Sequence, residues 1–222
     1  MQTDSSRAHV FSFLSGLVLL GLFQVIGKVL PTAAINWAPP YFQLAGQVLI
    51  LVATVIAWAA LEWEHGSMPR LGKVSVFNLI LGLVAVVLVH YAGQILHDVL
   101  GSGHELPRDV DKAMIDAGLG AVVFASAVVV GPIVEEMIFR GFLFSAPNWD
   151  RNAFSTFALV VVTSAIFSAT HTDYTQPTTF ISIFLTGLVL GIARFASGGV
   201  LLPIVLHMCT NAIVFMEMLF SH

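Results

Sequence analysis

The sequence predicts an all-α fold, a polytopic bundle of about seven transmembrane helices, with an eighth left open. Of its 222 residues, 57% are hydrophobic and only 10% are charged, whereas about a quarter of the residues of a soluble domain are charged. The mean hydropathy is +0.90. Crossing the hydrocarbon core takes about 20 apolar residues of helix. Stretches of this kind lie at 10–30, 41–63, 75–97, 114–145, 154–171, 177–197 and 200–220.

Two of these stretches depart from a simple helix. The first follows Arg7 like a signal peptide, but it is longer than the roughly 7–15 residues of a signal core, so we expect a retained helix. The fourth is too long for one straight perpendicular span, and Pro132 is where a kink is expected. Pro203 is a second candidate for a kink, and the two kinks would open a water-filled cavity. The alternative is that both are ordinary prolines of membrane helices.

The charges indicate an orientation and limit the partners. Six of the nine Lys and Arg residues lie on one side if the N-terminus is cytoplasmic, which favours that topology. With a net charge of −4 and no basic stripe, nucleic acid is not an expected partner, whereas the lipid bilayer is. Cys209 is the single cysteine, so an intrachain disulfide is excluded, and we interpret it as a packing residue.

The most informative pattern is Glu135-Glu136-x-x-x-Arg140 in the fourth stretch. A charge at the bilayer centre costs roughly 2.5–3.5 kcal/mol on insertion scales, so an ionisable cluster there is by default a candidate functional site. Residues four apart share a helix face, so Glu136 and Arg140 can pair. Glu135 is rotated by one residue and stays available as a base. The alternative is that all three form one inert buried network.

Two further polar pairs follow along the chain. Phe167 and His171 share a face at the end of the fifth stretch, which places an imidazole beside an aromatic ring. His207 and Asn211 share a face in the last stretch. Side chains of this kind can donate to a developing oxyanion, or they can join helices by hydrogen bonds. Three such clusters in one small membrane chain favour a functional site over packing.

These motifs carry a resemblance. Glu-Glu-x-x-x-Arg at 135–140, Phe-x-x-x-His at 167–171 and His-x-x-x-Asn at 207–211, in this order, resemble the three motifs of the CPBP family (CAAX protease and bacteriocin-processing, also called Abi). That family includes the type II CAAX prenyl endopeptidases. The resemblance covers roughly 114–220. It implies one membrane domain over 1–222, in which 114–220 form a CPBP-like catalytic core and 1–113 are variable N-terminal helices.

The resemblance also implies an activity, the hydrolysis of a peptide bond within the membrane, and a role for each matching residue. It implies that Glu135 and His171 activate the attacking water. It implies that His207 and Asn211 stabilise the oxyanion. The residues with supporting roles would be Glu136, Arg140 and Phe167.

The cofactor expected from the sequence is none, with zinc as the alternative. The family is often called a metalloprotease, and Glu135, His171 and His207 could bind zinc with a position left open for water. However, the two histidines do not have the His-Glu-x-x-His spacing that presents both ligands from one helix. We therefore favour a metal-free mechanism that depends on glutamate.

The resemblance leaves the substrate and two other functions open. It allows a peptide or protein substrate such as a prenylated C-terminal peptide, a bacteriocin precursor, a leader peptide or a membrane-embedded regulator. One rival function is a noncatalytic scaffold or regulator of another membrane protein. The other is an ion-coupled transporter that uses the buried charges, although matched broken helices in two halves are missing. A chain this compact suits the cytoplasmic membrane of a bacterium or archaeon.

Counting the helix rise from the proposed cytoplasmic boundary places the motif residues at different depths in the membrane. At 1.5 Å per residue, Glu135 lies about 15 Å and His207 about 10 Å from that boundary. By the same count, His171 lies about 25 Å in. The three side chains can meet only if the fifth helix tilts or begins elsewhere than the hydropathy indicates.

Overall fold

The computed structural model describes residues 2–33, 39–65, 70–101, 105, 114–145 and 152–220. Its regular structure in these ranges is helical, and seven helices are long and apolar enough to cross a membrane. The predicted fold class is confirmed. Six of the spans lie in single helices: α1 (Gln2–Ala33), α2 (Pro39–His65), α3 (Val76–Leu100), α7 (Ala153–Thr170), α8 (Pro177–Ser197) and α9 (Leu201–Phe220).

Local sequence sets several helix ends. Ser75 and Asn152 cap the N-termini of α3 and α7, because each side chain accepts a hydrogen bond from the backbone N–H three residues on. Gly101 and Gly198 end α3 and α8 in the left-handed conformation, with φ of 63° and 67°. These caps satisfy backbone groups at the ends of the helices.

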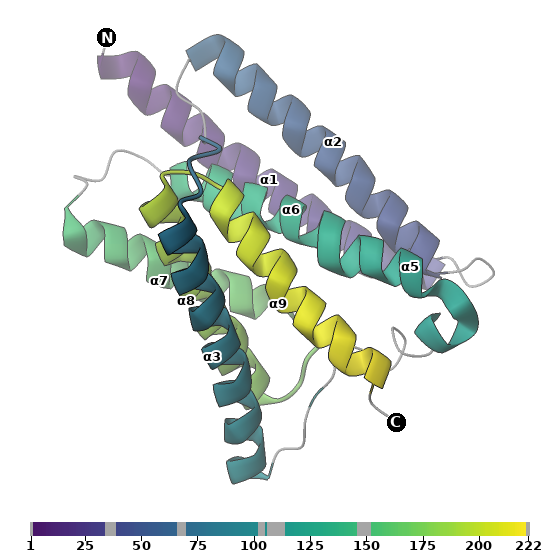
Figure 1. Cartoon of the computed structure of the whole chain (residues 1–222). Coiled ribbons are helices and arrows are strands. Elements are labelled where there is room, and N and C mark those ends of the chain that lie inside the picture. Colours follow the sequence, from purple (N-terminus) through teal and green to yellow (C-terminus); the bar gives the residue numbers. More distant parts are fainter. Residues whose placement is uncertain are drawn as a thin grey trace.

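Figure 1 shows α1 and α2 as a hairpin that lies along the fourth span, while α9 lies between this group and α3. Helix α8 packs against α3, α7 and α9. The largest buried cluster joins α1, α2, the fourth span and α7, and includes Leu19, Ile50, Ile138, Phe142 and Phe167. The N-terminal helices therefore form part of the core that holds the motif residues in place.

The fourth span alternates between helix types. It runs through η1 (Ile115–Leu119), α5 (Gly120–Val123), η2 (Phe124–Val130), α6 (Gly131–Glu136), η3 (Met137–Phe142) and η4 (Leu143–Ser145), and η1, η2 and η3 are π-helical.

The fourth span is broken at Gly118, and the kinks predicted at Pro132 and Pro203 stay predictions. The non-helical backbone of the fourth span is at Gly118, with φ of 84°, because glycine alone adopts this conformation at no steric cost. Pro132 lies in the first turn of α6, after the π-turns of η2. Pro203 lies in the first turn of α9, where its missing N–H has no partner to lose.

Helices α7 and α8 approach closely at Gly187 and Gly191. A Cβ atom at Gly187 would lie 3.0 Å from the Cβ of Ser164, and one at Gly191 would lie 2.8 Å from a methyl carbon of Val160. Gly187-x-x-x-Gly191 therefore serves as a helix-packing motif.

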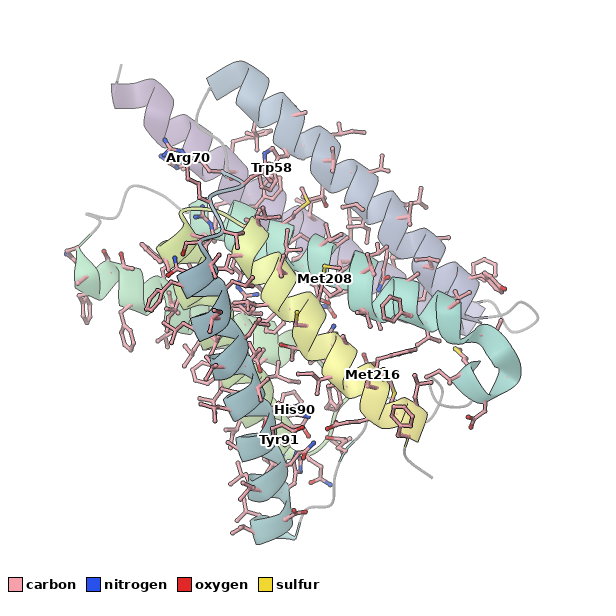
Figure 2. All side chains as sticks on the ribbon, in the orientation of Figure 1. Trp58, Arg70, His90, Tyr91, Met208 and Met216 are labelled. Atoms are coloured by element: carbon pink, nitrogen blue, oxygen red, sulfur yellow. The ribbon has the colours of Figure 1, made fainter. Side chains whose placement is uncertain are left out.

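Large apolar side chains cover the outside of the bundle. Figure 2 shows them projecting from the outer faces of the helices. Phe77, Ile95 and Phe154 are 73%, 62% and 79% exposed. A soluble protein rarely exposes contiguous apolar surface of this kind. The chain is a multi-pass membrane protein.

Candidate active site

Glu136 and Arg140 form a fully buried ion pair, each with 0% exposure. Nη1 of Arg140 donates to Oε1 of Glu136 over 2.8 Å, and Nη2 donates to the carbonyl of Gly187 over 3.0 Å. The guanidinium also lies over the ring of Phe167, 4.7 Å from its centroid. The predicted pair is confirmed, and it ties the fourth span to α7 and α8.

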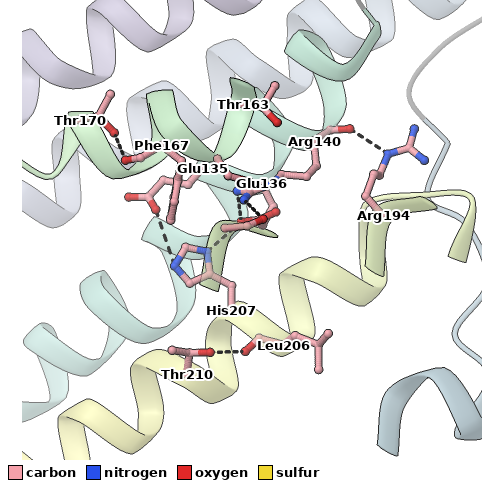
Figure 3. Close-up of polar contacts among 12 residues, drawn as sticks. Glu135, Glu136, Arg140, Thr163, Phe167, Thr170, Arg194, Leu206, His207 and Thr210 are labelled. Carbon is pink, nitrogen blue, oxygen red and sulfur yellow. Dashed lines mark hydrogen bonds and ion pairs between the residues drawn. The ribbon is translucent and has the colours of Figure 1, made fainter. Parts of the chain in front are cut away.

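His207 joins this pair from α9. Its Nδ1 lies 2.9 Å from Oε1 of Glu136, and its Nε2 lies 3.7 Å from Oε2 of Glu135 (Figure 3). A carboxylate can only accept, so Nδ1 carries a proton. The side chain of Glu135 is 17% exposed, against 0% for Glu136. Glu136 is therefore paired with Arg140, as the sequence predicts, while Glu135 borders a cavity.

The Phe167 ring connects the two histidines. Its centroid lies 4.7 Å from that of His171 and 5.6 Å from that of His207. Phe139 packs edge-on against the same ring at 5.2 Å. Phe167 therefore spaces both imidazoles while it shields Arg140 from water.

His171 follows the last residue of α7, and its ring is anchored by the backbone. Nδ1 lies 2.8 Å from the carbonyl of Phe167. Because a carbonyl only accepts, Nδ1 carries the proton, and Nε2 of the neutral ring keeps its lone pair. His171 and His207 thus differ in what their Nε2 atoms face: a cavity in one case and Glu135 in the other.

The structure brings His171 to the cavity of Glu135 although α7 begins at Ala153, close to the residue that hydropathy indicates. The first turns of α7 project beyond the bundle at the left of Figure 1, and Phe154 and Phe157 there are 79% and 65% exposed. Counting rise from the first residue of α7 therefore exaggerates the depth of its other end. His171 lines a cavity together with Glu135.

Asn211 is held by the π-turns before Pro132. Its Nδ2 donates to the carbonyl of Ala127 over 2.8 Å. The N–H of Gly131 donates to the carbonyl of Ser126 five residues earlier, which is a π-helical hydrogen bond. The next bond of this pattern would run from residue 132 to the carbonyl of Ala127, but Pro132 has no N–H to donate. Because Pro132 lacks this N–H, the carbonyl of Ala127 can accept the hydrogen bond from Asn211. The second N–H and the side-chain oxygen of Asn211 make no hydrogen bond to any described residue.

Two cavities of about 150 Å³ each meet at His171. The first, which we call the α1–α2 cavity, is also lined by Glu135 and Thr170. The second, the α3–α9 cavity, is also lined by His207 and Asn211. A water occupies about 30 Å³ of liquid, so each cavity has room for several. The arrangement can hold a water beside a carboxylate on one side and donors on the other.

Several polar residues that line these cavities were not predicted from the sequence. In the α3–α9 cavity, Glu217 of α9 lies 2.8 Å from Nε2 of His90, and Gln94 donates to the same carboxylate oxygen over 2.7 Å. Figure 2 labels His90 on α3, near the C-terminal part of α9. In the α1–α2 cavity, the missed residues are Gln24, Gln43 and Gln47. The available signal was a polar side chain inside an apolar stretch.

The side-chain geometry does not favour the zinc alternative. Nδ1 of each motif histidine is engaged, His171 with a carbonyl and His207 with Glu136, so only the two Nε2 atoms could bind a metal, as in many metal sites. Among the residues that the structure describes, no three His, Cys, Asp or Glu side chains are grouped as metal ligands. Zinc takes three or four such ligands at about 2.0–2.3 Å. The donors present do not fit that requirement as they stand.

The fold and site define a polytopic membrane protein with a buried carboxylate, guanidinium and imidazole cluster. Residues 117–213 match the family described as type II CAAX prenyl endopeptidase Rce1-like. This segment contains all seven motif residues, and the resemblance indicated by the motifs is confirmed.

Two curated relatives are similar to this chain. An uncharacterized 24.3 kDa protein of Escherichia coli is 32% identical over 130 residues, or 57% of this chain and 58% of the relative. The membrane-embedded CAAX protease MroQ of Staphylococcus aureus (strain USA300) is 26% identical over 140 residues, or 61% of this chain and 55% of the relative. The chain thus spans little more than half of either relative. No solved structure matches it.

Proposed function

We propose that the protein is an intramembrane endopeptidase that hydrolyses a peptide bond with water activated by Glu135 and His171. The observation behind the proposal is that the two adjacent glutamates have different surroundings. Glu136 is sealed against Arg140, while Glu135 borders a cavity that His171 also lines. An inert network would leave neither carboxylate open to water. Similarity to a named CAAX protease supports the same reaction class.

The first step uses groups of the α1–α2 cavity. Glu135 removes a proton from water while Nε2 of His171 accepts the second O–H and orients the oxygen. The water oxygen bonds to the substrate carbonyl carbon, whose oxygen becomes an oxyanion. His207, with both nitrogens protonated, and Asn211 donate to that oxyanion from the α3–α9 cavity. Glu135 then returns its proton to the leaving amine as the C–N bond breaks, which gives a carboxylic acid and an amine.

The substrate class proposed is a peptide or protein held at the membrane, such as a prenylated C-terminus or a leader peptide. The proposed location is the cytoplasmic membrane of a bacterium or archaeon, and the two similar proteins are both bacterial. These residues act without a bound metal in this proposal.

The test compares wild type with Glu135→Ala, Glu135→Gln and His171→Ala by quantitative proteomics of the membrane fraction. Asp98→Asn is the matched control, because Asp98 is an exposed carboxylate on α3 away from the motif residues. Loss of a general base lowers the rate by about 100-fold or more. We expect a cleavage product in wild type and the control and its loss in the three variants.

A different outcome would support the rival function, a noncatalytic scaffold. If no product depends on Glu135 and the biological phenotype survives in Glu135→Gln, the protein acts as a noncatalytic scaffold. Each variant must first reach the wild-type level in the membrane.

A further inference from the structure

Three glutamines of the N-terminal helices line the same cavity as Glu135 and His171. Gln24 belongs to α1, and Gln43 and Gln47 belong to α2, within the spans His9–Ile26 and Tyr41–Leu61. We call this set the amide wall. Its members lie outside 117–213, the part that matches the protease family.

Gln47 is oriented by the protein itself. It is 8% exposed, and its Oε1 accepts a hydrogen bond from Oγ of Ser126 over 2.8 Å. That bond directs the Nε2 end away from Ser126. Within the described part of the chain, Nε2 makes no hydrogen bond, it lies 3.4 Å from where a Cβ of Gly131 would be, and Gln47 lines the cavity.

Gln24 and Gln43 are half-buried, and neither side chain makes a hydrogen bond to another described residue. An amide that is removed from water without a partner is destabilising. In a membrane helix, such a group marks a functional position by default. Two unpaired amides beside a third that is held in position indicate a surface prepared for a ligand with hydrogen-bonding groups.

Peptide hydrolysis within a membrane creates such a ligand. A segment must leave the helical conformation before a base can reach its carbonyl carbon, and its N–H and C=O groups then lack partners in hydrocarbon. A glutamine amide offers donors and an acceptor together without charge. It can therefore pair with both kinds of backbone group of an extended segment.

The charges that line the cavity limit the kind of ligand that can bind there. Its lining includes Glu135 and Asp173 but no Lys or Arg among the described residues. A free terminal carboxylate would be repelled there. An internal stretch of peptide carries no such charge.

We propose that the amide wall binds an internal, extended segment of the substrate by backbone hydrogen bonds and positions its scissile carbonyl beside Glu135 and His171. This inference rests on the proposed function and adds the recognition site to it. Gln24, Gln43 and Gln47 are positioning residues and take no part in the chemistry.

The test uses purified full-length protein and a library of quenched-fluorescent peptides of about ten residues, some 33 Å when extended. The best-cleaved peptide is compared with its central core of about four residues. The variants are Gln24→Leu, Gln43→Leu and the double variant, with Gln43→Asn as the conservative change. Leu49→Ala is the control on the outer face of α2, where Leu49 is 65% exposed.

A hydrogen bond to a peptide group contributes about fivefold to tenfold in affinity. We expect each Leu variant to raise KM for the long peptide by about that factor, with kcat within about twofold and little change for the core. Gln43→Asn should recover part of the loss. Unchanged KM in the double variant overturns the amide wall while leaving the proposed hydrolysis intact.

Binding is measured separately, by fluorescence anisotropy with the tightest-binding library member, its central bond reduced to prevent cleavage. Binding that depends on Gln24 and Gln43 without any cleavage by wild type supports the wall and contradicts the proposed function. Binding by wild type that the Leu variants leave unchanged overturns the wall. If no peptide binds and none is cleaved, both proposals fail.

Discussion

Nδ1 of His207 lies 2.9 Å from Oε1 of Glu136, the same oxygen that accepts the hydrogen bond from Arg140. One carboxylate oxygen therefore fixes both a guanidinium and a proposed oxyanion donor. Glu136 is more than the counterion of Arg140, because it sets which nitrogen of His207 faces Glu135. The proposed function therefore couples stability and catalysis through this atom.

The first prediction separates the two adjacent glutamates. Glu136→Ala leaves Arg140 buried without its counterion, and breaking a buried pair costs about 3–5 kcal/mol. We expect a lower folded yield and a lower Tm, measured by size-exclusion chromatography and thermal unfolding in detergent. Glu135→Gln keeps the Glu136–Arg140 contact and should fold like wild type while losing activity. Normal yield of Glu136→Ala would contradict the structural role.

The second prediction concerns the contact between α7 and α8. Gly187→Ala places a Cβ 3.0 Å from the Cβ of Ser164, and the carbonyl that Arg140 uses must shift. Overpacking of this kind costs about 1–3 kcal/mol. Gly21→Ala is the matched control, because nothing lies within 4 Å of its added Cβ. We expect Tm to fall for the first variant alone, and equal Tm values would refute the close approach.

The third prediction tests how Pro132 affects Asn211. Asn211→Ala leaves the Ala127 carbonyl without its donor, which costs about 1–3 kcal/mol if the group is buried. Adding Pro132→Ala supplies a new backbone N–H nearby. The double variant should regain part of the stability but none of the activity, because the proposed oxyanion donor is still missing. A double-mutant cycle of Tm and rate measures this, and additive stability losses would argue against the coupling.

The fourth prediction concerns pH and Glu105, which lies outside the membrane spans. Burial raises the pKa of its carboxyl, but hydrogen bonds from Thr175 N–H, Thr179 hydroxyl, Gln176 N–H and Thr175 hydroxyl together lower it below the ordinary 4.5. A lowered folded-state pKa stabilises the protein above the unfolded-state value, and this contribution is lost as the pH falls through the folded-state value.

The measurement is thermal unfolding of wild type and Glu105→Gln across pH. Glu105 holds the start of α8 through the N–H groups of Thr175 and Gln176. We expect wild type to be more stable at neutral pH and the difference to shrink once the pH falls below about 4.5. A difference that is constant from pH 7 to pH 3 would show that the carboxylate charge plays no part.

The fifth prediction concerns metal. Purified active protein should retain its rate after treatment with a strong chelator, because the proposed base is Glu135 and the donor set does not fit zinc as it stands. Inductively coupled plasma analysis provides the direct measurement. One zinc per chain that is lost together with activity, and restores activity on return, would replace the metal-free mechanism.

Much of this molecule could be predicted because membrane helices obey simple rules. Spans follow from apolar length, since every backbone group in lipid must be paired within a helix. The Glu136–Arg140 pair follows from helical spacing alone, because its members are four residues apart on one helix. Proline is tolerated in the first turn of a helix, where Pro203 lies, and the sequence does not show where that turn begins.

Contacts between helices could not be read in the same way. The pairing of His207 with Glu136, and of Asn211 with Ala127, depends on how α9 lies against the fourth span. The amide wall was missed because Gln24, Gln43 and Gln47 gain meaning only when α1 and α2 pack beside Glu135.

The sequence by itself determined the membrane class, the helices and the chemical groups available, because hydropathy and spacing along one helix are local properties. Tertiary structure alone decided which cavity Glu135 borders, which nitrogen of each histidine is engaged by a neighbouring group, and which helices complete the site. Those outcomes depend on packing between segments far apart in the chain, where a few ångströms separate a buried ion pair from an open base.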